Sequence, residues 1–118
     1  MLWMDPRRPA PYVFEADRAK PEAERVTFQL AVLTPGEWAS AIDLTAGDRD
    51  LWQGAFGLAL LRAGLRGWSG AGAPPFAVDA RGRPTDETLA LLRPDDRGEL
   101  AKAIFRVNNL TDAQTGKS

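Results

Sequence analysis

The stretch from Asp48 to Trp68 constrains the fold most, because it is the longest apolar segment with helical spacing in the chain. One apolar stripe runs along it, with a second stripe directly beside it. The first comprises Leu51, Ala55, Leu58 and Leu65, and the second comprises Trp52, Phe56, Ala59 and Ala63. So wide an apolar surface predicts a helix over about 49–65 that other elements contact on more than one side.

Three glycines, Gly54, Gly57 and Gly64, interrupt this predicted helix. Each costs about 1 kcal/mol relative to alanine in a helix interior. We therefore expect them to let another backbone come close, either that of the last helix or that of another chain. A glycine-rich loop is predicted to follow, over about 67–75.

The chain before this stretch predicts an extended arm and a pair of strands. Residues 1–11 contain three prolines, which disfavour a helix. This arm is either a loose terminus or a segment that docks on a neighbouring subunit, and Trp3 favours docking because its large ring is costly to leave in water. Residues 12–16 and the alternating segment 25–33 predict an antiparallel hairpin.

Three further helices are predicted from their start signals. Thr34 caps a helix over 35–44, with Pro35 at its first position and Glu37 placed to complete a capping box with Thr34. Thr85 caps a short helix that extends to Leu92, and the last helix begins at Pro94 and ends at about Asn108. We therefore expect an α+β fold, in which an N-terminal antiparallel β-hairpin packs on a bundle of about four helices. The expected parts are the arm 1–11, a single domain 12–110 and a flexible tail 111–118.

Composition excludes several classes of chemistry. The chain has no cysteine and no histidine, so it lacks the ligands of a thiolate metal site and the base of a Ser-His-Asp triad. Its net charge of −1 favours neither nucleic acid nor an anionic membrane as a partner. No signal peptide and no apolar run of membrane-spanning length are evident. We expect a non-enzymatic cytoplasmic protein without cofactor or metal.

The remaining candidate sites have structural explanations. The acidic pairs Asp48 with Asp50 and Asp95 with Asp96 each stand where a helix begins, and a helix dipole favours anions there. The Gly-x-Gly motif of residues 70–72 lacks the lysine that a phosphate-binding loop requires, and two prolines follow it. Four tryptophans are many for 118 residues, and they suit core packing or an interface better than nucleic-acid stacking.

The order of these features resembles that of small proteins encoded in the structural module of tailed bacteriophages. The quoted segments are Tyr-Val-Phe-Glu-Ala-Asp-Arg-Ala-Lys-Pro-Glu-Ala-Glu at 12–24, Leu-Thr-Pro-Gly-Glu at 33–37, Gly-Leu-Arg-Gly-Trp at 64–68, Glu-Leu-Ala-Lys-Ala-Ile at 99–104 and Asn-Asn-Leu-Thr at 108–111. Some of those phage proteins are tail assembly chaperones. The resemblance covers roughly residues 12–114 and lies in packing residues, with no active-site motif.

This resemblance implies a role in virion morphogenesis in the host cytoplasm. A chaperone of this kind coats the apolar tape-measure protein and helps to recruit tail tube subunits, and we expect it to form a homo-oligomer. The alternatives are a virion subunit, such as a tail or head–tail joining protein, and a small inhibitor of a host enzyme. The residues expected at the interaction surface are Trp3, Trp52, Phe56, Gly57, Gly64 and Trp68.

Overall fold

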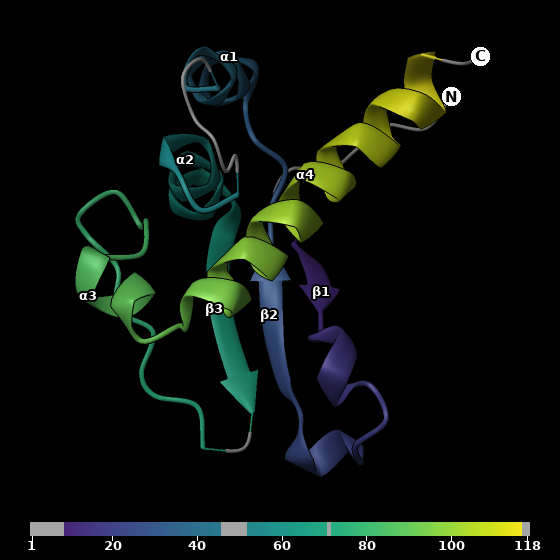
Figure 1. Ribbon diagram of the computed structural model, residues 1–118, viewed down its shortest axis with the longest axis vertical. Helices are drawn as coiled ribbons and strands as arrows, with labels where there is room; N and C mark the ends of the chain where they lie inside the picture. The colour runs from purple at the N-terminus through teal and green to yellow at the C-terminus, as the bar shows by residue number, and fades with distance from the viewer. Residues whose placement is uncertain (1–8, 46–51, 71, 117–118) are drawn as a thin grey trace.

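The computed structural model describes residues 9–45, 52–70 and 72–116, and the side chains as far as Asn108 (Figure 1). The elements follow one another as β1 (Ala10–Tyr12), η1 (Glu15–Asp17), η2 (Glu22–Glu24), β2 (Val26–Leu30), α1 (Pro35–Asp43), α2 (Ala55–Gly64), β3 (Leu65–Gly70), α3 (Asp86–Ala90) and α4 (Pro94–Gly116). This is an α+β fold, as the sequence predicts.

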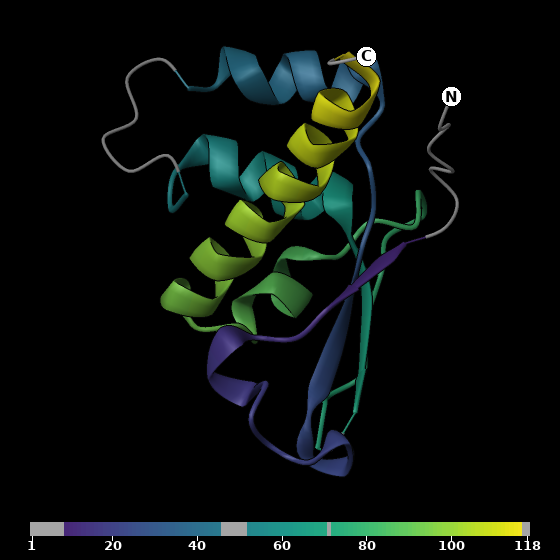
Figure 2. The same cartoon turned by 90° about the vertical axis from the view of Figure 1, so that its right-hand side faces the viewer.

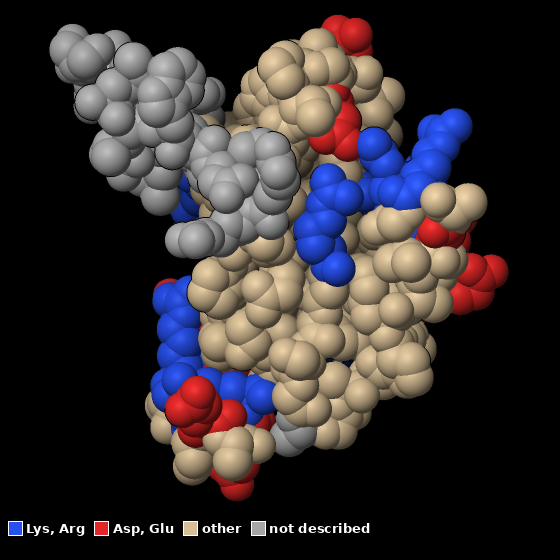
Figure 3. Space-filling view, turned by 180° about the vertical axis from the view of Figure 1, so that it is seen from behind, with Lys and Arg blue, Asp and Glu red and all other residues tan. Residues whose placement is uncertain are grey.

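The strands form one antiparallel sheet in the order β1-β2-β3. Figure 2 shows the four α-helices on one side of this sheet, and no helix of the described residues covers its other face. The alternation of β2 and β3 places uncharged side chains on that other face, among them Thr27, Gln29 and Ser69. Most of its visible middle is uncharged, and the charged side chains gather mainly towards its margins (Figure 3).

The first predicted strand is displaced towards the N-terminus. It spans Ala10–Tyr12 rather than 12–16, so the last residues of the predicted arm pair with β2. Pro11 is tolerated because β1 is an edge strand and needs fewer backbone donors. A 3-10 turn begins at Glu15, whose backbone N–H donates to the carboxylate of Glu99 in α4. Residues 1–8, including Trp3, lie outside the described residues.

The predicted helix over 49–65 is partly wrong, because a third strand was missed. Helix α2 ends at Gly64, and the chain continues directly into β3, where a loop was expected from residue 67. The β2–β3 register shifts between Gln29 and Leu30. Leu65 pairs with Leu30, and Trp68 pairs with Phe28, which lies on the same face of β2 as Leu30. An extra residue in β3 therefore places Leu65 and Trp68, three positions apart, on the same side.

This bulge explains the wrong prediction. Apolar residues three or four apart are the signature of a helix. Leu61, Leu65 and Trp68 have that spacing, although a strand holds the last two. Gly70 ends β3 with a positive φ of 136°, and a Cβ atom there would lie 2.2 Å from the carbonyl oxygen of Arg25.

The start of α2 also differs from the prediction. Trp52 and Gln53 lie in a turn, Gly54 is the N-cap, and the helix begins at Ala55. Glycine at the N-cap is compatible with the extended backbone that precedes a helix. The proposed cap Asp48 and the first-turn Asp50 lie outside the described residues.

The capping predictions for α1 and α3 are confirmed. The Thr34 hydroxyl accepts from the Glu37 backbone N–H at 3.1 Å, and the Glu37 carboxylate accepts from the Thr34 N–H at 2.9 Å. The Thr85 hydroxyl likewise accepts from the Thr88 N–H at 3.2 Å. Helix α3 ends at Ala90, two residues before the predicted end.

Helix α4 begins at Pro94 as predicted, but it continues past Asn108 to Gly116. Asn108 does not stop the helix, because its polar side chain is satisfied within the fold. Its Nδ2 donates to the Ile104 carbonyl at 2.8 Å, and its Oδ1 accepts from the Leu33 N–H at 3.1 Å. The amide thus joins α4 to the segment after β2.

The core lies between the sheet and the helices, and its centre is the contact of α2 with α4. Its fully buried large side chains include Phe56, Leu60 and Leu61 of α2, Leu30 and Leu65 of the sheet, and Leu100 and Ile104 of α4. Gly64 allows α2 to approach α4 closely, since a Cβ atom there would lie 2.7 Å from Cγ2 of Ile104. The sequence predicted that the glycines of this stretch approach either the last helix or another chain. Gly64 approaches the last helix. Within the described residues, no helix is long and apolar enough to cross a bilayer.

We expect Gly64→Ala to lower the free energy of unfolding by about 1–3 kcal/mol, because the new methyl group would overpack a buried, β-branched side chain. Gly36→Ala in α1 is the matched control, since a Cβ atom there meets nothing within 4 Å. The control should leave stability unchanged or raise it by up to about 1 kcal/mol. Urea unfolding of both variants measures the difference, and equal stabilities would contradict the packing described.

Candidate functional site: a groove along α4

Between Asp95 and Asn108, much of α4 is covered by the rest of the chain, and one stripe of charged side chains faces solvent. Asp95, Lys102 and Arg106 are exposed and Glu99 is half-buried. The residues that share these turns, including Gly98, Leu100, Ala101, Ala103 and Ile104, are buried. The four stripe positions follow one another at spacings of four, three and four, so they form a single row along the helix.

One wall beside this stripe is the turn before α2. The side-chain amide Nε2 of Gln53 donates to the Pro94 carbonyl at 2.7 Å and ties the turn to the start of α4. Gly98 makes room for it, since a Cβ atom there would lie 2.6 Å from that Nε2 and 3.9 Å from Cβ of Trp52. Gly57 does the same from within α2, where a Cβ atom would lie 2.0 Å from the Trp52 carbonyl oxygen. Two glycines therefore allow the Trp52 turn to pack closely against α2 and α4.

The opposite wall is the N-terminal segment around Tyr12 and Glu15. The Tyr12 hydroxyl donates to Oε2 of Glu99 at 2.5 Å, and the Glu15 backbone N–H donates to the same oxygen at 2.9 Å. Burial, the hydrogen bond to Glu99 and the negative charge of Glu99 raise the pKa of Tyr12 to about 12. The phenol thus stays protonated and keeps β1 attached to α4.

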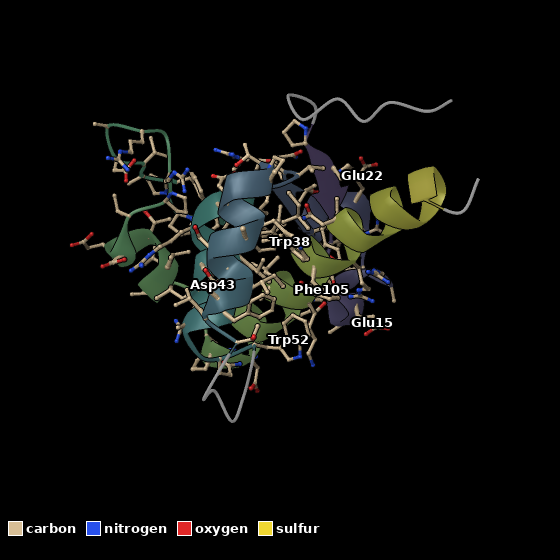
Figure 4. The ribbon with its side chains drawn as sticks, turned by 90° about the horizontal axis from the view of Figure 1, so that it is seen from above. Glu15, Glu22, Trp38, Asp43, Trp52 and Phe105 are labelled. Atoms are coloured by element: carbon tan, nitrogen blue, oxygen red, sulfur yellow. The ribbon has the colours of Figure 1, made fainter. Side chains whose placement is uncertain are left out.

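Aromatic rings fill the space between α1, the Trp52 turn and α4. Figure 4 shows Trp38, Phe105 and Trp52 side by side in this space. The Phe105 ring centroid lies 5.6 Å from that of Trp38, 5.4 Å from that of Trp52 and 6.2 Å from that of Phe56. Aromatic pairs at such distances contribute about 0.5–1.5 kcal/mol each beyond their buried area.

Together these elements enclose an open groove of about 740 Å³, which we call the α4 groove. Its lining includes Tyr12, Trp52, Gly98, Glu99, Lys102 and Phe105. The groove is acidic at one end, where Glu15, Asp95 and Glu99 lie, and basic at the other, where Lys102 and Arg106 lie. Aromatic surface between charged ends suits the binding of a polypeptide segment.

The predicted interaction residues divide between two places. Trp52, Phe56, Gly57 and Gly64 all belong to the α2–α4 region, where Trp52 lines the groove and Phe56 supports it from the core. Gly57 and Gly64 contact other parts of the same chain.

Trp68 belongs to a second aromatic cluster on the sheet. Its ring packs on Phe28 at 6.1 Å and on Phe76 at 4.8 Å between centroids, and its Nε1 donates to the Pro74 carbonyl at 2.6 Å. These contacts hold the 72–76 segment against the sheet. The role of Trp68 in the structure is therefore to cover the core next to β3.

Sequence reasoning missed Tyr12, Glu99, Lys102 and Phe105 as groove residues. The spacing of Asp95, Glu99, Lys102 and Arg106 was a usable signal, since it marks one exposed row on the predicted last helix. Nothing in the sequence indicated that Tyr12, 87 positions away from Glu99, would lie beside it.

Several charged side chains elsewhere in the described chain form ion pairs. Arg83 contacts Glu37 at 2.5 Å, and Arg62 contacts Asp86 at 3.0 Å. Burial acts to raise the pKa of Glu37, but the hydrogen bonds from Thr34 and the charge of Arg83 outweigh it and lower the pKa overall. Among the described residues, no group of three or more acidic side chains could hold a metal ion.

Comparison of the chain with protein-family models, with curated protein sequences and with solved structures found no match.

We expect the absorbance of tyrosinate near 295 nm to rise with a midpoint at about pH 12 in the folded protein. Tyr12 is the single tyrosine of the chain, so this absorbance reports on it alone. Because its folded pKa lies above the unfolded value of 10.0, the contact stabilises the fold below pH 10 and that stability is lost as the pH rises through about 12.

Glu99→Gln should move this midpoint down towards 10, since the negative charge is removed, while burial keeps it above that value. The same titration in urea provides the unfolded reference. A midpoint near 10 in wild-type protein that is still folded by circular dichroism would contradict the Tyr12–Glu99 contact.

Proposed function

We propose that this chain is a non-enzymatic morphogenesis protein of a tailed bacteriophage, of the tail assembly chaperone type. In this role it binds the tape-measure protein and assists the recruitment of tail tube subunits. The observation that carries the proposal is the α4 groove, an open hollow with Trp52 and Phe105 at its centre and charges at its ends. The proposal also rests on the resemblance of residues 12–114 to phage structural-module proteins.

The groove suits a transient protein partner for two reasons. Its aromatic rings are only half-buried, so a partner side chain can still cover them. Its charged ends keep the hollow hydrated when it is empty, which makes the free chaperone less prone to aggregate. An apolar tape-measure helix would bury its apolar residues against these rings, and its charged residues would form ion pairs with those at the ends of the groove.

A virion subunit is the second candidate function, and the sheet edge favours it. Strand β3 is an edge strand of six residues, and in the described part of the chain no strand pairs with its outer side. At the other edge, β1 has three residues and includes Pro11, which blocks strand addition. An open strand edge is a common means of joining subunits.

The composition of phage particles distinguishes the two functions. The chain should be abundant in infected cells and absent from purified mature particles, as measured by quantitative mass spectrometry with the tail tube protein as the internal reference. Deletion of its gene should yield heads without tails, with the tape-measure protein degraded or aggregated. Many copies of the chain per mature particle would contradict the chaperone function and support the virion subunit.

A further inference from the structure

We propose that the α4 groove binds one amphipathic helix of a partner protein, antiparallel to α4, with acidic residues near its own N-terminus and basic residues near its C-terminus. This inference rests on the proposed function, because it specifies the chemistry of the partner segment. It is carried by the order of charges along the groove and by the direction of α4.

The charge order selects the chemistry of the partner. At the N-terminal end of the α4 stripe, Asp95 and Glu99 face the groove together with Glu15, so this end attracts basic side chains. At the other end Lys102 and Arg106 are exposed and attract acidic ones. Lys102 also lies 6.0 Å from the Trp52 ring centroid, which places its charge beside the aromatic centre. A partner with a single sign of charge would be repelled at one end.

The direction follows from helix electrostatics. A helix is stabilised by acidic residues in its first turn and basic residues in its last turn. A partner that lies antiparallel to α4 has its first turn over Lys102 and Arg106 and its last turn over Asp95 and Glu99. The charges that suit the groove are then the same charges that stabilise the partner helix itself. A parallel partner would need the opposite arrangement, which its own dipole disfavours.

The length of the stripe sets the length of the segment. From Asp95 to Arg106 the axis of α4 advances about 16 Å, so about three turns of a partner helix cover it. Between the charged turns, one or two large apolar side chains would meet Trp52 and Phe105. The turn that carries Trp52 is closely packed, because Gly57 brings the α2 backbone against the Trp52 carbonyl and Gly98 brings the α4 backbone against the Gln53 side chain. The aromatic floor is therefore preformed for the partner.

Two synthetic peptides of about 18 residues test the proposal, since shorter helices are marginal in water. Both carry leucines on one face at the centre. The first has two glutamates in its N-terminal turns and two lysines in its C-terminal turns, and the second has the glutamates and lysines exchanged. Fluorescence anisotropy of labelled peptides with the full chain at low salt should show the first binding roughly tenfold more tightly. Salt should reduce this ratio.

Because the exchanged peptide is also a weaker helix, variants of the protein provide the decisive comparison. Lys102→Glu with Arg106→Glu alters two exposed groove residues and should abolish the preference for the first peptide. The matched control is Lys20→Glu with Arg81→Glu, which makes the same change of net charge at exposed positions that do not line the groove. The control should keep the tenfold preference.

Equal binding of both peptides, or no binding of either, would overturn the proposal. So would a concentration-dependent dimer that Lys102→Glu with Arg106→Glu dissolves, because the occupant would then be a second copy of the chain. The proposed function fails by a different result, namely retention of the chain in mature particles. The peptides could show no preference although the chain is absent from mature particles and required for tail formation. In that case the chaperone function stands and the assignment of the groove is wrong.

Discussion

The structure depends on how closely α4 approaches the elements around it. Gly64 lets α2 lie against Ile104, and Gly98 lets the Trp52 turn rest on the first turns of α4. Tyr12 and Glu15 hold the N-terminal segment to Glu99 from the other side. With the other sides of α4 covered between Asp95 and Asn108, the charged stripe there becomes the floor of a groove. The groove therefore depends on close packing of α4 against the Trp52 turn on one side and the N-terminal segment on the other.

Local signals in the sequence predict those elements that local interactions determine. Thr34 and Thr85 cap helices as predicted, and Pro94 begins the last helix, because a cap needs only neighbours within one turn. Strand β3 was missed because its bulge gives Leu65 and Trp68 a helical spacing. Its formation depends on pairing with β2, about 40 positions earlier in the chain, and no local signal reports such pairing.

The candidate site was predictable in part for the same reason. Trp52 was identified from its size and its apolar surroundings, and it lines the groove. Trp68 was grouped with it on the same argument, yet it packs on Phe28 and Phe76 beside the sheet. The contact of Tyr12 with Glu99 joins the first strand to the last helix, 87 positions apart, so only the folded structure reveals it. Similar residue types in the sequence therefore acquire different roles from their positions in the fold.

Zero-length carbodiimide cross-linking of the chain with its partner, analysed by mass spectrometry, tests the central claim most directly. This reagent joins amines to carboxylates that already form an ion pair. Lys102 and Lys20 both lie in the described chain, but only Lys102 lines the groove. The account predicts a cross-link from Lys102 to an acidic residue near the start of a partner helix. Cross-links that involve Lys20 and not Lys102 would contradict it.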